Sequence, residues 1–356
     1  MKRVLFPERA NWQQAHQEIG FDYYNLPSRD GSMYWSEGVA YEFSLKQIEQ
    51  LEDASNELHQ MCLEVAGDMI QRGHYPEYFQ IHPAAIPLIE HSWNNQAPML
   101  YGRFDFAYDG QAIKMLEYNA DTPTGLLEAS VAQWHWIEQV ENIANRDQFN
   151  SIHEKLIERW KQLYPARSRV HFAACQEAGR EDWGNLEYLM DTAFQAGLNV
   201  SELSMENIGW NGTAFVDLHQ QEIQHLFKLY PWEWIWEENF SQFLKPETEW
   251  IEPCWKMLLS NKALLIELWK RFPNHPLLLE THAYDAHAHY AGKWVRKPIL
   301  AREGANIHIL QNNVDCGAAS GSFYFDDYDK YGYVMQRWVK TPLHEGMLPT
   351  LGLWMV

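Results

Sequence analysis

The chain has 356 residues, of which 46% are hydrophobic and 14% aromatic, so it can bury a sizeable core and is long enough for about two domains. Its formal net charge of -20 argues against sequence-independent nucleic-acid binding, which requires Lys and Arg to neutralise phosphates. The charge fits a cationic substrate such as a polyamine, or simply an acidic soluble protein. No run approaches the roughly 18 apolar residues of a membrane span, and the N-terminus lacks the apolar stretch of a signal peptide. We therefore expect a cytoplasmic protein with no membrane or nucleic-acid partner.

The cysteines are too widely spaced for a local zinc knuckle, and no C-x-x-C pair occurs. Reduced, mostly structural thiols are therefore expected. The positions are Cys62, Cys175, Cys254 and Cys316.

The first long element is predicted to be a helix that begins after Ser44. Ser44 and Gln47 form a capping box, and apolar residues recur at helical spacing from Ile48 to Met69. Gly73 is placed to end the helix. The pattern predicts a long amphipathic helix that packs on one face.

A β-hairpin follows, and its strands carry polar residues two positions apart, which is the side-chain repeat of a strand. Each strand sends its polar pair to one face and its aromatic residues to the other. The polar pairs are Arg103 with Asp105 and Glu117 with Asn119; the aromatic residues are Phe104, Phe106 and Tyr118.

The register of this hairpin depends on its turn, which contains an Asp-Gly pair at 109–110. A loop of residues 109–111 would set Arg103 opposite Glu117 and bring all four polar residues to one face. A two-residue loop would turn Glu117 to the other face. Two carboxylates, an amide and a guanidinium on rigid strands suit Mg²⁺ that holds a polyphosphate. The alternative is a solvated hairpin face with a cross-strand ion pair.

The hairpin runs into a turn rich in hydroxyl groups. Thr122 and Thr124 are capping-type residues, Pro123 forbids helix before it, and a helical run follows from Leu126 to Trp134. The N-terminus of that helix is a natural anion site, although every helix needs a cap.

From Arg167 the pattern changes to strand, helix and strand at 170–175, 185–196 and 198–203, which predicts a small parallel sheet. Further helices are predicted around 222–229 and 261–272. The segment 231–238 combines three Trp with three carboxylates, which favours either a cation-binding wall or a packing corner. The last part of the chain, from Trp294, is predicted to be rich in strands.

A basic segment stands out in this acidic chain: Arg296, Lys297 and Arg302 precede a loop that contains Gly304. A strand carrying Lys297 and a loop with free backbone N–H groups would suit a phosphate chain, although the run is no Walker A motif and a solvated basic turn is the alternative. Lys262 lies upstream at the start of a helix, where it could reach a phosphate or the surface. Gln336 lies downstream in a predicted buried strand, 333–339, that could border an adenine.

Taken together, these segments resemble the synthetase half of glutathionylspermidine synthase, and especially its shorter stand-alone relatives described as acid–amine ligases. The resemblance covers nearly the whole chain. It implies an α/β (α+β) chain with an ATP-grasp fold, a pre-ATP-grasp-like α/β domain and a permuted motif order, in which the metal motif precedes the nucleotide lysines. The matching residues are Arg103-Phe104-Asp105, Glu117-Tyr118-Asn119, Lys262, the Lys-Pro-x-x-x-Arg-Glu-Gly run at 297–304, and Gln336.

The resemblance implies an ATP- and Mg²⁺-dependent ligase that joins a carboxylate to an amine through an acyl-phosphate. Arg103 would steady the transferred phosphoryl group, and one or two Mg²⁺ would be held by Asp105, Glu117 and Asn119. The implied substrates are a peptide-like acid and a cationic amine. The implied cofactor-binding residues are Arg103, Phe104, Asp105, Lys262, Lys297, Arg302, Gly304 and Gln336.

The implied division places a helical region and the metal-binding hairpin in residues 1–165, the small parallel-sheet domain in 166–250, and the nucleotide-binding and lid part in 251–356. The family's sequence continues past a strand like 351–356, so one phosphate-contacting arginine of the family is absent here. Thr122 and Thr124 are serine in the glutathione-using enzymes, so the resemblance does not assure glutathione as the acid.

Two alternative functions remain open. One is a nucleotide- or polyamine-binding module without turnover. The other is a glycosidase, which needs two catalytic carboxylates but neither Lys262 nor Lys297.

Overall fold

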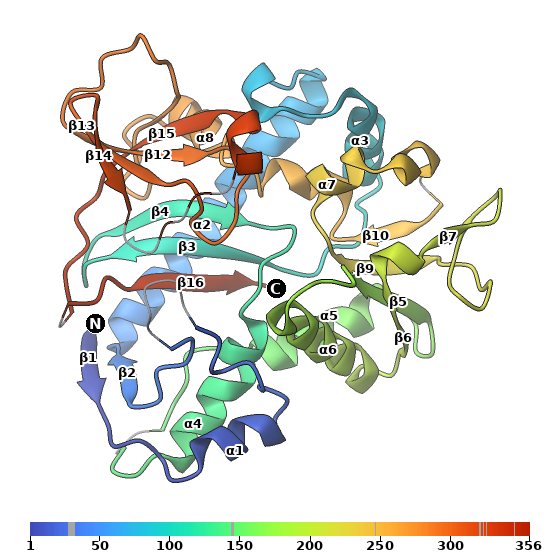
Figure 1. The fold of residues 1–356 in the computed structure, drawn as a ribbon, viewed down its shortest axis with the longest axis horizontal. Coiled ribbons are helices and arrows are strands. Elements are labelled where there is room, and N and C mark those ends of the chain that lie inside the picture. The colour runs from blue at the N-terminus through green and yellow to red at the C-terminus, as the bar shows by residue number, and fades with distance from the viewer. Residues whose placement is uncertain are drawn as a thin grey trace.

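The computed structural model describes residues 1–27, 33–143, 146–245, 247–319, 322, 324, 326–344 and 346–356. Figure 1 shows a central three-stranded sheet with a five-stranded sheet above it and a four-stranded parallel sheet beside it. No helix of the described residues is long and apolar enough to cross a membrane. All four cysteines are free, as predicted.

The central sheet is antiparallel and has the order β16-β3-β4, with β3 at Gly102–Tyr108, β4 at Ile113–Asn119 and β16 at Thr350–Met355. Helix α2, Leu45–Arg72, packs against its apolar face in the same core cluster. The predicted capping box at Ser44 is present, and Gly73 ends the helix in the left-handed region with φ 58°.

The five-stranded sheet has the order β11-β15-β12-β13-β14 and contains the predicted strand that carries Lys297 and most of the strand predicted at 333–339. Every neighbouring pair in it is antiparallel. Helix α8, Leu264–Arg271, contacts both α2 and β11, which joins this sheet to the central core. The strands are β11 Thr281–Ala283, β12 Lys293–Pro298, β13 His308–Gln311, β14 Val314–Ala318 and β15 Tyr333–Arg337.

The parallel sheet has the order β10-β9-β5-β6 and confirms the predicted strand–helix–strand unit, which is β5 Arg169–Ala174, α6 Arg180–Gln195 and β6 Asn199–Ser204. The helix predicted at 222–229 is wrong, because His225–Leu229 forms strand β9. Its apolar residues fit a helical repeat as well as a strand, but β9 pairs with β10 on one edge and with β5 on the other, and all of its residues except His225 are buried. Strand β10 is Glu249–Ile251.

The remaining elements surround these sheets. Helices α5 and α6 pack with β5 in a second core cluster that also holds the aromatic N-terminal segment. The short helix α7, Trp232–Glu237, follows β9 directly. The other elements are β1 Lys2–Leu5, α1 Trp12–Glu18, β2 Val39–Glu42, α3 Ile86–Asn94, α4 Gln133–Gln139, α5 Ile152–Leu163, β7 Gly209–Trp210 and β8 Phe215–Val216.

Candidate active site

The hairpin β3–β4 brings its four polar residues to one face, but not in the predicted register. Asp105, not Arg103, pairs with Glu117, and Arg103 pairs with Asn119. The loop between the strands has one residue more than predicted, since Tyr108 pairs with Ile113, and a bulge between the Asp105 and Phe106 pairs then shifts β4 by one residue. The longer loop and the bulge each shift the pairing by one residue in the same direction, and a total shift of two residues keeps the four polar side chains on one face, as predicted.

The ring of Phe104, a cofactor-binding residue by the resemblance, lies on the opposite face, as the alternation along the strand predicts. It is 0% exposed and stacks on Tyr118 with ring centroids 3.8 Å apart. A nucleotide on the polar face could therefore meet only the backbone of Phe104.

Arg103 is held in a fixed orientation by its neighbours. Its Nε donates to Asp105 Oδ1 at 2.7 Å and its second terminal nitrogen to Asp105 Oδ2 at 3.1 Å, a bidentate pair. The other terminal nitrogen donates to the backbone oxygen of Thr124 at 2.5 Å, and the guanidinium lies 5.7 Å from the ring centroid of Trp354. The positive charge of Arg103 is therefore already oriented in the absence of a ligand.

Two lysines from distant segments reach the hairpin. Lys262 Nζ lies 3.1 Å from Glu117 Oε2, and Lys297 Nζ donates to the backbone oxygen of Leu116, the residue at the bulge, at 3.2 Å. The structure thus brings Arg103, Asp105, Glu117, Lys262 and Lys297 together from β3, β4, the turn before α8 and β12.

The charges of this cluster shift one another's protonation. Burial acts to raise the pKa of Glu117, but Lys262 and Lys297 lower it below its usual range. Burial raises the pKa of Asp105, with Glu117 adding to the effect and Arg103 opposing it. Burial also lowers the pKa of Lys297 to about 8, although Glu117 acts to raise it. A further cation would stabilise the charged forms of the two facing carboxylates, and a polyanion would stabilise the ammonium form of Lys297.

The shifted pKa of Lys297 predicts a pH dependence of the ATP binding that the sequence resemblance implies. Phosphate favours the ammonium form, so binding raises this pKa, and affinity should be full well below pH 8 and fall as pH rises above it. We expect the Kd for ATP to rise by up to about tenfold per pH unit there, measured by calorimetry. Lys297→Arg keeps the charge and should flatten the profile; an unchanged fall in that variant would assign the titration to another group.

Gln336 is 1% exposed and links Lys297 to the hairpin. Its Oε1 accepts from Lys297 Nζ at 2.7 Å, and its Nε2 donates to the backbone oxygen of Met115 at 3.3 Å. The backbone of β15 pairs with strands on both sides at this residue. In this arrangement Gln336 positions Lys297, and the predicted contact with adenine stays a prediction.

Asn119 belongs to a turn that Ser260 organises. The Ser260 hydroxyl accepts from the N–H groups of Ala120 and Asp121 at 2.8 and 2.7 Å and donates to Asn119 Oδ1 at 3.4 Å. Sequence reasoning missed Ser260, because a single serine 140 residues away in the chain carries no motif.

The predicted hydroxyl cap of the following helix is replaced by an amide. Asn185 Oδ1 accepts from the N–H groups of Gly125 and Leu126 at 3.0 and 2.9 Å, while the Thr124 hydroxyl donates to Glu181 at 3.0 Å. Asn185 therefore occupies this helix N-terminus in place of an anion. The helix itself continues as a π-helical turn, Glu128–Ala132.

The first turn of α6 adds carboxylates close to the hairpin. Burial raises the pKa of Asp182 to about 6, with Glu181 and then Glu303 adding to the effect. Burial also raises the pKa of Glu128, whose Oε1 accepts from the Tyr34 hydroxyl at 2.5 Å. This negative region, which had no motif in the sequence, lies beside Thr124 and favours a positively charged ligand.

The predicted cation-binding wall at 231–238 is not available for a ligand. Glu233 pairs with Arg302 at 2.7 Å, and Glu237 pairs with Lys330 at 2.8 Å. Glu238 accepts from the Tyr230 hydroxyl, and Trp232 and Trp236 are buried. The segment is therefore mainly a packing and docking element.

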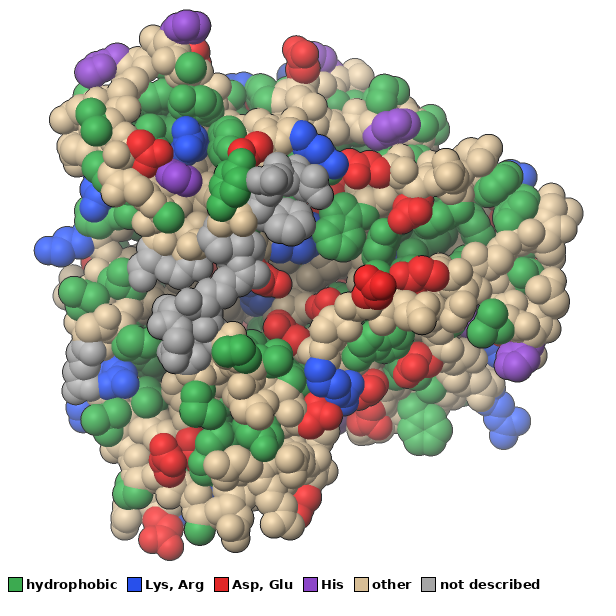
Figure 2. All heavy atoms as spheres, in the orientation of Figure 1, with side chains coloured by type: hydrophobic (Ala, Val, Ile, Leu, Met, Phe, Trp, Pro, Cys, Tyr) green, Lys and Arg blue, Asp and Glu red, His purple; other side chains and the backbone are tan. Residues whose placement is uncertain are grey.

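The glycine loop projects over the site from the five-stranded sheet. Lys262 Nζ donates to the backbone oxygen of Ala301 at 2.8 Å, and Gly304 is in the left-handed region with φ 71°. Figure 2 shows that this face of the molecule is hollowed at its centre, where acidic and basic side chains gather. Among the described residues no group of three or more His, Cys, Asp or Glu could hold a metal, and the hairpin set has two carboxylates and an amide.

Comparison with known proteins identifies relatives along the whole chain. A family model described as "Glutathionylspermidine synthase preATP-grasp" matches residues 3–356. A Haemophilus influenzae protein named "Putative acid--amine ligase" is 51% identical over 364 aligned residues, which cover 100% of this chain and 92% of that protein.

More distant relatives are longer proteins. Trypanothione synthetase of Crithidia fasciculata is 25% identical over 98% of this chain and 57% of its own length. The bifunctional glutathionylspermidine synthetase/amidase of Escherichia coli is 25% identical over 77% of this chain and 48% of its own length. The chain thus spans about half the length of these two relatives.

Among solved structures, a glutathione synthetase-like effector (GSS30) from Globodera pallida matches with a TM-score of 0.56 over 95% of this chain and 84% of that chain. Its 9% sequence identity makes this a likeness of fold alone. Fold and relatives define an enzyme of the class that forms carbon–nitrogen bonds, with the mixed α/β fold of ATP-grasp ligases. Within that class, the chain belongs to the glutathionylspermidine synthase pre-ATP-grasp family, which confirms the predicted family and fold class.

Proposed function

We propose that this protein is an ATP- and Mg²⁺-dependent ligase that joins a carboxylic acid to an amine through an acyl-phosphate. The observation that carries the proposal is the polar face of the hairpin, where Asp105 lies opposite Glu117 and Lys262 and Lys297 reach the same strand. A glycosidase would have no use for two lysines at its carboxylates.

The hairpin residues fit magnesium. Carboxylate and amide oxygens are hard donors, and Mg²⁺ takes one or two protein carboxylates and completes its shell with water and phosphate oxygens. The raised pKa of Asp105 beside Glu117 is relieved by a divalent cation. In this proposal Asp105, Glu117 and Asn119 would hold one or two Mg²⁺, which would supply positive charge to the phosphates.

The cationic residues would have different roles toward the phosphates of ATP. Lys262 and Lys297 would hold the triphosphate, and Arg103 would stabilise the charge on the transferred phosphoryl group. A carboxylate oxygen of the acid attacks the γ-phosphorus and ADP leaves; the amine nitrogen then attacks the acyl carbon and phosphate leaves. The Gly304 loop would exclude water that hydrolyses the acyl-phosphate.

The negative region beside Thr124 supports a cationic amine. Glu181 and Asp182 lie in the first turn of α6, where burial raises the pKa of both and the charge of Glu303 adds to the effect. An alkyl-ammonium placed there would neutralise this repulsion, whereas a second anion would add to it. A peptide-like acid fits the same proposal, since relatives are named for glutathionylspermidine and trypanothione.

The experiment is to measure ADP release with ATP and Mg²⁺ against a panel of peptides and di- or polyamines. We expect release that requires the acid, an amide and phosphate as products by mass spectrometry, and loss of activity with EDTA that Mg²⁺ restores. The apparent affinity for the amine should also fall as salt rises, because acidic residues attract it.

Two other outcomes of this experiment would change the proposal in different ways. Binding of Mg²⁺–ATP without ADP release in any acid–amine pair would support a binding module without turnover. Preference for a neutral or anionic co-substrate would contradict the cationic amine while leaving the ligase chemistry intact.

A further inference from the structure

Helix α7 begins at a point fixed by the core. Trp232 is 0% exposed, its backbone N–H donates to Asp121 Oδ2 at 3.0 Å, and its indole N–H donates to the backbone oxygen of Glu252 at 3.0 Å. Asp121 follows the hairpin residue Asn119 by two positions. The residues after Trp232 are therefore placed relative to the metal-binding hairpin.

The next two residues of α7 hold the guanidinium of Arg302. A terminal nitrogen of Arg302 donates to Glu233 Oε1 at 2.7 Å, and its guanidinium carbon lies 5.2 Å from the ring centroid of Trp234. The Arg302 and Glu233 side chains are only 25% and 11% exposed. Among the described residues this is the single hydrogen bond of the Arg302 guanidinium, so most of its five donors remain for an anion.

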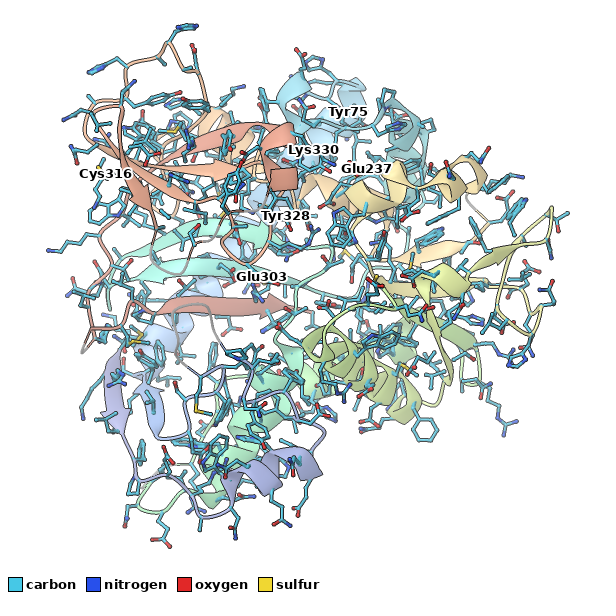
Figure 3. All side chains as sticks on the ribbon, viewed as in Figure 1. Tyr75, Glu237, Glu303, Cys316, Tyr328 and Lys330 are labelled. Atoms are coloured by element: carbon cyan, nitrogen blue, oxygen red, sulfur yellow. The ribbon has the colours of Figure 1, made fainter. Side chains whose placement is uncertain are left out.

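The other end of α7 is attached to the short 3-10 helix Asp326–Tyr331, which precedes β15. Glu237 Oε1 accepts from Lys330 Nζ at 2.8 Å and from the Tyr331 hydroxyl at 2.7 Å. Figure 3 shows Glu237 and Lys330 close together, while Glu303, the neighbour of Arg302, lies lower, over the central sheet. Glu233 and Glu237 thus dock the same helix at separate points, and only Glu233 contacts the basic loop.

We propose that Glu233 and Trp234 are positioning residues for Arg302, which they orient so that its free donors meet an anionic group of the nucleotide. The inference rests on the proposed function, because Arg302 is a phosphate contact only if the site binds ATP. The physical reason is that an arginine on a glycine-containing loop has many orientations, and a carboxylate together with an aromatic face selects one of them.

A double-mutant cycle tests this inference. Glu233→Ala should lower kcat/KM for ATP about tenfold, and in an Arg302→Ala background the same change should have less than about a twofold effect. Glu233→Gln keeps an oxygen acceptor and should recover part of the loss. Glu237→Ala is the matched control on the same helix and should leave kcat/KM within about twofold of wild type.

Three results would overturn the inference. The first is an equal loss of kcat/KM from Glu233→Ala in the wild-type and Arg302→Ala backgrounds. The second is a loss of kcat/KM from Glu237→Ala as large as that from Glu233→Ala. The third is tighter ATP binding with unchanged kcat in Glu233→Ala, which would mean that Glu233 competes with phosphate for Arg302. If the wild-type protein cleaves no ATP, the proposed function fails instead. Thermal unfolding of the same four proteins then still measures whether Glu233 and Arg302 are coupled.

Discussion

Replacing Arg103 by alanine should lower kcat by about 10²–10³-fold while changing the Kd for ATP by less than about threefold. The guanidinium is held by both oxygens of Asp105 and by the backbone oxygen of Thr124, so its charge is already oriented. An oriented charge of this kind stabilises charge that develops in the transition state more than charge already present in bound ATP. Single-turnover measurement of ADP formation gives kcat for the chemical step, and calorimetry gives Kd.

Lys297→Ala is the matched comparison, because Lys297 belongs to the same cluster and is proposed to hold the triphosphate. It should weaken ATP binding and affect turnover less. Arg103→Lys keeps the charge but loses the bidentate pair with Asp105, so it should recover only part of kcat. Equal losses of ATP affinity in Arg103→Ala and Lys297→Ala would remove the role assigned to Arg103.

The polar face of the hairpin was predictable because alternation along a strand is a local property. Arg103 and Asp105 must share a face whatever the turn does. The pairing between strands was not predictable, because it depended on a longer loop and a bulge, which together shift the register by two residues. The conclusion about the face was correct although the register behind it was wrong.

Residues that act through long-range contacts had no signal in the sequence. Ser260 organises the turn after Asn119, and Asn185 caps the helix after Gly125, yet each is a single polar residue outside any motif. The segment 225–229 was predicted as a helix for a related reason. Its position between two other strands determines its conformation, and the spacing of its apolar residues does not reveal that position. Site roles and domain boundaries stay predictions.

Asp121 and Lys228 should carry the largest single contribution to stability among the residues around the site. Lys228 Nζ lies 2.6 Å from Asp121 Oδ1, and the two side chains are 0% and 1% exposed. Lys228 also lies 4.8 Å from the ring centroid of Trp232, whose N–H donates to the other Asp121 oxygen. The pair joins β9 of the parallel sheet to the end of the hairpin.

Asp121→Ala leaves the Lys228 charge buried without its partner, so we expect a loss of about 3–5 kcal/mol in the free energy of unfolding, measured by urea titration. Lys228→Met should cost a similar amount, and the double change Asp121→Asn with Lys228→Met should cost less than the sum, because no unpaired charge remains. Lys155→Ala, which removes an ion pair with side chains 57% and 56% exposed, is the control and should change stability by less than about 0.5 kcal/mol. A loss below about 1 kcal/mol in Asp121→Ala would mean that water reaches Lys228, and the hairpin would then need another attachment to the parallel sheet.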